Sequence, residues 1–468
     1  MICFPMTVDG AALPAQAVFD VLDPATEEVF AQAPACTPAQ LDLAFEAAAR
    51  AAGAWAADPA ARRDLLRAAA GAVSAARDEL AVLLATEQGK PVRAAAFEVD
   101  QHALWLRESA ALPLAEEILQ DDGTAVAALV RRPLGVVAAI TPWNYPILLA
   151  GWKLGPALVA GNTVVLKPSP YTPVATLRLG ELLAGVLPPG VVNVISGPDP
   201  LGAAMTAHPA VAKISFTGSV RTGVAVARAA AAGMKRLTLE LGGNDAAIVL
   251  DDVAPEAIAK SLFWAAFTNC GQICAGIKRL YVPERLHDPL VEALVAVASR
   301  ARVGPATDER SRIGPLNNRT QFERVAALVE EAVTAGARVA VGGLAPARPG
   351  YFYAPTVLTG AREGMRVVDE EQFGPVLPVL TYREVDEAVA RANAGPFGLS
   401  GSVWGGDAAR AESVARRLEC GTAFVNDHLT VAPHLPFGGW KMSGLGVENG
   451  PWGLDQFTQP QVVYRRRG

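Results

Sequence analysis

Between residues 134 and 243 the sequence alternates short apolar runs with segments of helical spacing. The apolar runs show no polar alternation, which is typical of strands buried on both faces of a parallel sheet. They lie at 136–140, 163–167, 191–195 and 213–217, with helices expected at 146–160 and 173–186. This alternation predicts an α/β fold with ligand sites at the carboxyl ends of the strands.

The chain has 468 residues, more than the roughly 250–300 that one hydrophobic core serves, so we expect at least two domains. A second α/β region follows the first. Its expected helices lie near 254–267, 287–302 and 319–335, and its expected strands at 245–250, 338–341, 376–381 and 399–404. Before both regions, residues 38–101 have the apolar spacing of packed helices, after a short β-like segment at 18–24.

Two extended segments, 122–133 and 459–467, stand far apart in the sequence. Together they would build a small projecting sheet whose open edge needs a partner. The alternative is an ordinary edge strand and a basic tail, and the residues alone leave both open.

Composition excludes several classes of function. A net charge of −6 gives no basic footprint for nucleic acid, and no apolar stretch is long enough to cross a membrane. The first ten residues lack the order of a signal peptide, and five cysteines in so long a chain favour a reducing cytoplasm. Cys270 and Cys274 have no second pair of ligands nearby, so we expect no metal site.

Cys274 follows an apolar helix-like run and a polar turn, where a side chain can be presented in a cleft. A thiol needs help to ionise at neutral pH, and Glu240 is the candidate base. Glu240 ends a strand and precedes Gly242 and Gly243, where burial can raise its pKa. By themselves, a buried cysteine and a glutamate at the end of a strand are more often structural.

Three further strand ends carry polar groups. The strand 213–217 leads into Gly218 and Ser219 at a helix start, which could hold a phosphate. The strand 163–167 ends in Lys167, and the strand 136–140 is followed by Asn144 between two prolines, with its amide free to donate. Each signal is weak alone, because a solvated lysine or a turn asparagine would look the same.

Taken together, these motifs resemble the aldehyde dehydrogenase superfamily from about residue 20 to 464. The motifs that carry the resemblance are Pro142-Trp-Asn-Tyr-Pro146, Lys167-Pro168, Phe216-Thr-Gly-Ser219, Leu239-Glu-Leu-Gly-Gly243, Gly271-Gln-Ile-Cys274, Glu371-Gln-Phe-Gly-Pro375 and Pro436-Phe-Gly-Gly439. The resemblance implies three parts: a dinucleotide-binding domain at 1–115 and 134–243, a catalytic domain at 244–442, and an oligomerisation arm at 116–133 and 455–468. It also implies a homodimer or homotetramer.

By the family's pattern, Cys274 is the nucleophile, Glu240 is the general base, and Asn144 with the Cys274 N–H forms the oxyanion hole. Lys153 and Glu448 match positions that relay the base's proton in some members. The implied reaction oxidises an aldehyde to a carboxylic acid with NAD, through a cysteine thiohemiacetal and a thioester that water hydrolyses. The resemblance assigns cofactor binding to Thr141, Trp143, Lys167, Ser169, Gly218, Ser219, Leu241, Glu371 and Phe373.

The sequence departs from the family at two places. Pro170 stands where NAD-preferring members often carry a glutamate, so NADP is an alternative cofactor, and Asn244 replaces the usual lysine. Positional correspondence gives an apolar, aromatic substrate pocket made of Tyr145, Leu148, Trp152, Ile273, Ala275, Leu429, Val431 and Phe437. We expect an apolar, aromatic or amino aldehyde. The alternatives are succinate semialdehyde, a silent binding or structural member of the fold, and an acyltransferase or esterase without redox chemistry.

Overall fold

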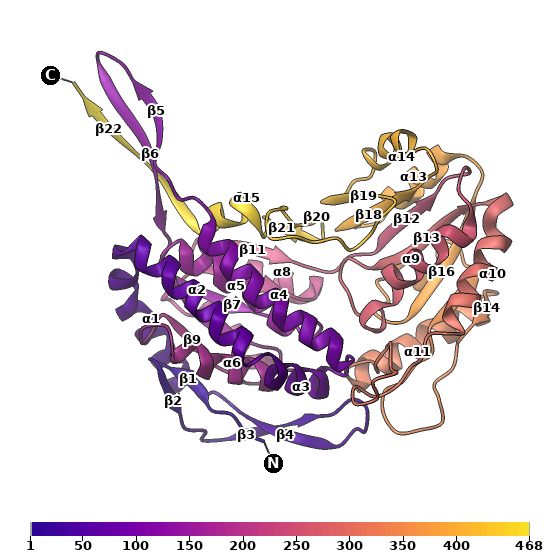
Figure 1. Cartoon of the computed structure of the whole chain (residues 1–468), viewed down its shortest axis with the longest axis horizontal. Helices are drawn as coiled ribbons and strands as arrows, with labels where there is room; N and C mark the ends of the chain where they lie inside the picture. The colour runs from indigo at the N-terminus through magenta and orange to yellow at the C-terminus, as the bar shows by residue number, and fades with distance from the viewer. Residues whose placement is uncertain (1, 468) are drawn as a thin grey trace.

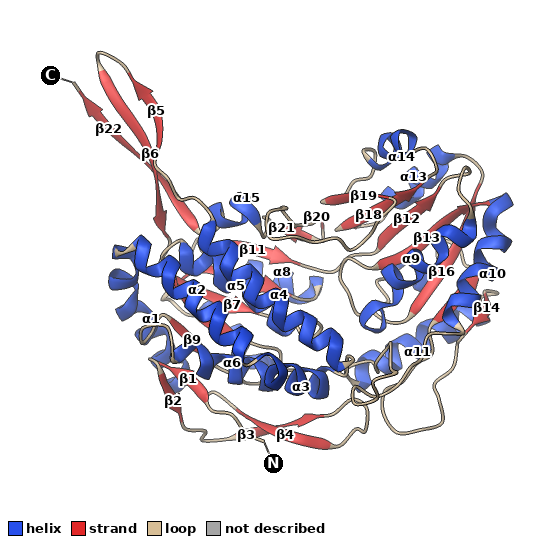
Figure 2. Cartoon of the chain, viewed as in Figure 1, coloured by secondary structure: helices blue, strands red, loops and turns tan. Residues whose placement is uncertain are grey.

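The computed structural model describes residues 2–467, which form two large sheets, each with helices packed on it, and a projecting arm (Figure 1). Figure 2 shows helices lying beside strands in both halves of the chain. The α/β class predicted from the sequence is confirmed.

The first sheet has eight strands in the order β2-β1-β9-β8-β7-β10-β11-β21. Its centre is parallel, and the register aligns Ile140 with Lys167 and Thr217 with Glu240, so these residues meet at one edge of the sheet. Its strands are β1 (Met6–Val8), β2 (Ala11–Leu13), β7 (Val136–Ile140), β8 (Thr163–Lys167), β9 (Val192–Val194), β10 (Val211–Thr217), β11 (Arg236–Glu240) and β21 (Gly444–Leu445).

Helices pack on this sheet or on the helices that cover it, and the first four in the chain fill the helical region predicted at 38–101. They are α1 (Pro38–Ala57), α2 (Pro59–Ala75), α3 (Arg77–Gln88), α4 (Val92–Ala111), α5 (Pro146–Val159), α6 (Val174–Ala184), α7 (Asp199–Ala207) and α8 (Val220–Ala231). Thr37 caps α1 with a reciprocal side-chain bond to Gln40, which explains its start. The sequence analysis did not predict α7, a helix of only nine residues.

The second sheet has the order β14-β15-β16-β13-β12-β18-β19, with only β14 antiparallel. Its strands are β12 (Asp245–Val249), β13 (Ile277–Pro283), β14 (Arg338–Val341), β15 (Thr356–Thr359), β16 (Val376–Tyr382), β18 (Ser400–Trp404) and β19 (Thr422–Val425). Its helices are α9 (Pro255–Phe267), α10 (His287–Ala298), α11 (Arg319–Thr334), α12 (Arg366–Asp369), α13 (Val385–Asn393) and α14 (Ala408–Ala415). The three predicted helices are present, and α10 ends four residues earlier than expected.

Three smaller elements complete the fold. A hairpin joins β3 (Val18–Leu22) to β4 (Val29–Pro34), and β17 (Phe397–Gly398) pairs with β20 (Trp440–Lys441). The arm is a three-stranded antiparallel sheet of β5 (Glu117–Asp121), β6 (Ala125–Pro133) and β22 (Thr458–Arg466), and it projects from the body (Figure 1). The two predicted extended segments do pair, along nine residues of register.

The last part of the chain returns to the first sheet before it enters the arm. β21 pairs antiparallel with β11, and α15 (Gly450–Asp455) follows it. Leu454 and Phe457 are buried in the core of the first sheet, although Phe457 falls in the range expected for the arm. Asn162 donates to the Phe457 carbonyl at 2.9 Å, which ties this segment to the loop before β8.

We predict that Gly421→Ala destabilises the fold, because a Cβ there would lie 1.6 Å from the Gly438 carbonyl oxygen, and backbone cannot move aside. Overpacking of this kind costs about 1–3 kcal/mol or more, which thermal unfolding would detect as a lower melting temperature. Gly53→Ala is the matched control, since its Cβ meets no atom within 4 Å inside α1. It should stabilise the helix by about 0.5–1 kcal/mol. Equal melting temperatures for the two variants would contradict the packing argument.

Candidate active site

Cys274 lies in a strained loop between α9 and β13. The loop starts with a short 3-10 turn, η1 (Thr268–Gly271). Within this turn the backbone is left-handed at three successive residues, with φ values of 51° at Asn269, 59° at Cys270 and 70° at Gly271. A Cβ on Gly271 would lie 2.1 Å from the Gly374 carbonyl oxygen, so only glycine fits there. Consecutive left-handed residues cost free energy, and they are found where function requires a particular loop shape.

A cavity of about 690 Å³ opens between the two sheets at the carboxyl ends of their strands. Cys274 and Glu240 both line it, from loops and strands that belong to different halves of the chain. The lining residues include Trp143, Asn144, Thr217, Gly218, Ser219, Arg221, Glu240, Leu241, Cys274, Arg324, Glu371, Phe373 and Phe397. A nucleophile and a carboxylate therefore face one space.

Glu240 is buried at the end of β11, and within the described residues neither carboxylate oxygen has a hydrogen-bond partner. Burial, together with the nearby Glu448 carboxylate, raises the pKa of Glu240 well above its usual value, while Lys153 opposes the rise. An unpartnered carboxylate with a raised pKa is free to take a proton from a substrate or a water molecule.

Lys153 and Glu448 form a buried ion pair of 2.6 Å behind Glu240. Lys153 also donates to the Thr217 hydroxyl at 2.8 Å, and Ser215 donates to Glu448 at 3.3 Å. The second oxygen of Glu448 has no partner in the part of the chain that the structure describes. This buried polar group joins the cavity through Thr217, which lines it.

Cys274 itself is partly exposed to the cavity. Burial raises the pKa of its thiol, and so do the carboxylates of Glu240, Glu371 and Asp245, whereas the Lys278 ammonium lowers it. Burial also raises the pKa of Glu371 and that of Asp245 to about 7 each. The site therefore contains several carboxyl groups and few positively charged groups to balance them.

Asn144 connects the two halves at this point. Its side-chain Nδ2 donates to the Gln272 carbonyl at 3.0 Å, while its own carbonyl accepts from Lys90 Nζ at 2.7 Å and from Asn269 at 3.1 Å. Lys90 is in turn paired with buried Glu98 at 2.5 Å, and Glu98 accepts from the Ile147 and Leu148 N–H groups at the start of α5. The sequence analysis missed Lys90 and Glu98. The stretch also carries Glu87, Arg93 and Asp100, so nothing in the sequence distinguished this pair from its charged neighbours.

Six of the nine residues predicted to bind a cofactor line the cavity, namely Trp143, Gly218, Ser219, Leu241, Glu371 and Phe373. Ser219 is the N-cap of α8, whose first turn can bind an anion. A Cβ on Gly242 would lie 2.1 Å from Glu371, so the glycine leaves room for that carboxylate. The cavity, the helix start and the small residues fit a dinucleotide.

The other three predicted cofactor residues, Thr141, Lys167 and Ser169, are buried and lie outside the cavity lining. Lys167 donates to the Pro168 carbonyl at 3.2 Å, and burial lowers its pKa to about 8. The Thr141 hydroxyl has no partner in the described residues. Thr141 follows β7, Lys167 is the last residue of β8, and Ser169 comes two residues after it.

An apolar cluster adjoins Cys274 on the side of α4 and α5. It contains seven of the eight predicted substrate-pocket residues: Tyr145, Leu148, Trp152, Ala275, Leu429, Val431 and Phe437. Trp105 stacks on Trp152 at 5.7 Å between ring centroids, and Phe437 meets Trp152 edge-on at 5.3 Å. Ile273 is buried but does not belong to this cluster. Trp105 was not predicted.

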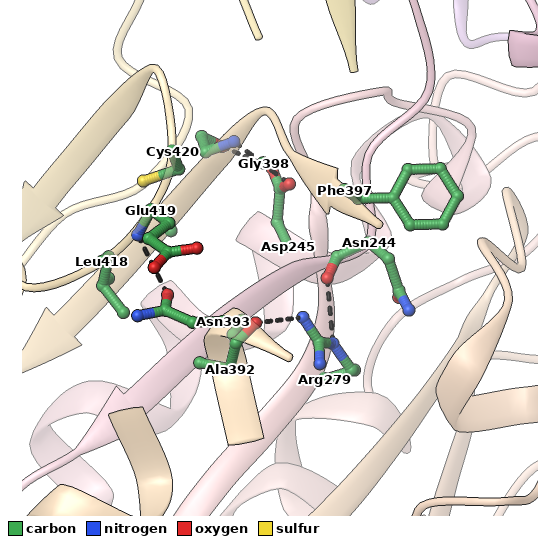
Figure 3. A pocket seen from close by; sticks show the side chains of 13 residues that line it. Asn244, Asp245, Arg279, Ala392, Asn393, Phe397, Gly398, Leu418, Glu419 and Cys420 are labelled. Carbon is green, nitrogen blue, oxygen red and sulfur yellow. Dashed lines mark hydrogen bonds between the residues drawn. The ribbon is translucent and has the colours of Figure 1, made fainter. Parts of the chain in front are cut away.

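Figure 3 shows a separate pocket behind β12, lined by Asp245, Arg279, Asn393 and Cys420 among others. Its volume is about 20 Å³, enough for about one water molecule. The Asp245 carboxylate accepts from the Ser400 N–H at 3.1 Å there. The pocket is too small for a substrate and serves packing around β12.

Among residues 2–467 no group of three or more histidine, cysteine or acidic side chains is placed to hold a metal ion. Within the same range, no helix combines the length and apolar character required to span a membrane.

Comparisons with known proteins agree with this geometry. The chain matches the aldehyde dehydrogenase family over residues 12–463. It is 41% identical to the aldehyde dehydrogenase LUC3 of Fusarium sp, covering 95% of this chain and 94% of the relative. It is 38% identical to a betaine aldehyde dehydrogenase of Cereibacter sphaeroides, covering 98% and 96%.

The fold is also similar to a solved structure, the NAD+ complex of an aldehyde dehydrogenase from Bacillus cereus. The two share 34% identity and a TM-score of 0.97, over 99% of this chain and 96% of that one. The chain therefore belongs to the aldehyde dehydrogenase family, and it is an oxidoreductase that acts on an aldehyde.

Proposed function

We propose that this enzyme oxidises its aldehyde to the carboxylic acid with NAD, using Cys274 as nucleophile and Glu240 as general base. The observation that supports the proposal most is that the thiol and the unpartnered, buried carboxylate line the same cavity. The relative from Bacillus cereus binds NAD+, which supports NAD here. NADP stays an alternative, since Pro170 occupies the position of the glutamate expected in NAD-preferring members.

In the first step the Cys274 sulfur bonds to the aldehyde carbon, and the carbonyl oxygen becomes an alkoxide. Asn144 Nδ2 and the Cys274 N–H are the donors proposed to hold that oxygen. NAD bound in the cavity would supply the two-electron oxidant that converts this adduct to a thioester on Cys274. Gly218, Ser219, Glu371 and Phe373 are the residues proposed to hold it.

In the second step Glu240 removes a proton from water, and the resulting hydroxide attacks the thioester carbon. The bond between sulfur and carbon breaks, and the acid leaves. Burial raises the pKa of Glu240, and a carboxylate with a raised pKa is a stronger base than one in water. We propose that Lys153 and Glu448 carry the proton onward from Glu240, since their ion pair lies directly behind it.

Aromatic side chains support an apolar, aromatic or amino aldehyde as the substrate. The cluster beside Cys274 contains the aromatic side chains of Trp105, Trp152, Tyr145 and Phe437. Lys90 Nζ lies 3.9 Å from the Tyr145 ring centroid but is already paired with Glu98. The Cereibacter relative is named for betaine aldehyde, which keeps amino aldehydes among the candidates.

The arm supports the proposal of a homodimer or homotetramer. Its outer strands β5 and β22 expose Ile118, Leu119, Val462, Val463 and Tyr464. Exposed apolar side chains on an unpaired edge are a surface that a second copy can cover.

We further propose that 1–115 with 134–243 binds the dinucleotide and 244–442 carries catalysis. The five free cysteines fit the proposed cytoplasmic location.

We predict that Cys274→Ala loses NAD-linked aldehyde oxidation by about 10³-fold or more, since no other group can form the thioester. Glu240→Gln should retain a burst of hydride transfer in stopped-flow absorbance at 340 nm, followed by slow turnover. Cys36→Ala, a thiol outside the cavity, is the control and should keep its activity. Wild-type turnover by Cys274→Ala would refute the covalent mechanism, and wild-type turnover by Glu240→Gln would remove its assignment as base.

A matrix of aldehydes and cofactors should rank apolar, aromatic and amino aldehydes above carboxylated ones by about tenfold or more in kcat/KM. Moving the carboxylate of such a substrate from water into an apolar cluster costs roughly several kcal/mol of binding free energy unless a cation pairs with it. The measurement is the initial rate at 340 nm with NAD and with NADP. If succinate semialdehyde gives the highest kcat/KM, the alternative substrate is supported instead. If the enzyme hydrolyses esters without reducing NAD, the alternative of an acyltransferase or esterase is supported.

Charging the arm should weaken assembly. The double variant Val462→Asp/Tyr464→Asp places two carboxylates on the exposed face of β22, so light scattering after size exclusion should show a smaller species than the wild type. Leu344→Asp changes an exposed apolar residue elsewhere and should leave the molar mass unchanged. A monomeric wild type would contradict the proposal.

A further inference from the structure

Lys278 is a buried lysine in β13, four residues after the nucleophile. Its ammonium group donates to the Gly271 carbonyl at 2.9 Å and to the Ile273 carbonyl at 2.9 Å. Both carbonyls belong to the loop that ends at Cys274. Lys278 makes no ion pair within 4 Å in the described part of the chain, so both of its side-chain hydrogen bonds go to this loop.

The bond to Ile273 also determines where the next N–H points. In a trans peptide the carbonyl and the N–H lie in one plane and point in opposite directions. Because Lys278 holds the Ile273 carbonyl, the Cys274 N–H must point away from Lys278. That N–H has no acceptor among the described residues, and Cys274 lines the cavity whereas Lys278 does not.

The glycines of the loop leave room for the Lys278 side chain to reach the two carbonyl groups. A Cβ on Gly276 would lie 3.1 Å from Lys278 Nζ, and Gly271 fits only as glycine. Three carboxyl groups face the same place from other elements: Glu240 at the end of β11, Asp245 at the start of β12, and Glu371 before β16. These raise the pKa of the Cys274 thiol, and Lys278 opposes them. The pKa of Lys278 is lowered by burial and raised by Glu371, Asp245 and Cys274.

We propose that Lys278 is a positioning residue for the nucleophile: it turns the Cys274 N–H toward the cavity as an oxyanion donor and places a positive charge behind the thiolate. This inference rests on the proposed role of Cys274. On ionisation the thiol proton goes to water, and the thiolate remains opposite the Lys278 ammonium. The charge favours the thiolate before substrate binds, and the fixed N–H stabilises the alkoxide after attack.

The test compares the pH dependence of Cys274 alkylation by iodoacetamide, followed by peptide mass spectrometry, in the wild type, Lys278→Met and Lys278→Gln. Alkylation forms the bond from sulfur to carbon, releases iodide and reports the thiolate. Loss of the positive charge should raise the alkylation midpoint by about one pH unit in both variants. At a fixed pH below the midpoint, the rate should therefore fall about tenfold.

Turnover separates the two roles of Lys278. Its replacement by methionine removes both carbonyl bonds, so kcat should fall further than in Lys278→Gln, whose amide can still donate to a carbonyl. KM should change less than kcat, because the lost interactions act on the alkoxide. Lys213→Met is the matched control, since Lys213 is equally buried and bonds to Thr238, away from the nucleophile loop. Its alkylation midpoint should match that of the wild type.

The inference is overturned if the alkylation profile of folded Lys278→Gln superimposes on that of the wild type, or if Lys213→Met shifts it equally. Lys278→Gln is close in size to lysine and keeps a donor, so it serves where Lys278→Met fails to fold. Activity of Cys274→Ala would instead refute the proposed mechanism. An inactive Cys274→Ala with unchanged Lys278 variants would refute only the role of Lys278.

Discussion

Hydrogen bonds across the boundary between the two sheets fix the reacting groups relative to each other. Asn144 comes from the first half and bonds to the Gln272 carbonyl in the second, while Glu371 from the second accepts from the Gly243 N–H at 3.1 Å. Asn317 adds a bond to the Glu87 carbonyl at 3.0 Å at the same boundary. A base on one sheet and a nucleophile beside the other can act together only while these bonds hold. Preorganisation of this kind avoids the entropy cost of assembling the groups for each turnover.

The second constraint is the balance of buried charge. Glu240 and Glu371 line the cavity, and Asp245 and Glu448 lie close to them. The buried lysines whose charges act on these carboxyl groups are Lys153, Lys213 and Lys278. Carboxyl groups in excess of cations cannot all ionise in a place with little water, so their pKa values rise. The imbalance adds to the effect of burial in raising the pKa of Glu240. It also makes each buried lysine important, because the position of its positive charge determines which nearby carboxyl group is ionised.

The sequence predicted most of the first sheet, because its central strands are continuous apolar runs: β7 and β8 match their predicted ranges at both ends. Prediction was poorer where an element depends on distant contacts. β1, β21 and the short α7 are defined by pairing or packing with partners far along the chain. Motifs located Cys274, Glu240 and Asn144, but they could not locate Lys278 or the pair Lys90 and Glu98. A lysine between apolar residues in a strand gives no sign of which carbonyls it will meet.

The pairing of β21 with β11 has a consequence for synthesis of the chain. Glu240 ends β11, yet the strand beside it and the Glu448 carboxylate behind it come more than two hundred residues later. While the ribosome is still translating the second half, the strand that carries Glu240 therefore has an open edge. Its surroundings are complete only when the last few dozen residues have emerged, so nascent chains and products of early termination lack a finished catalytic site.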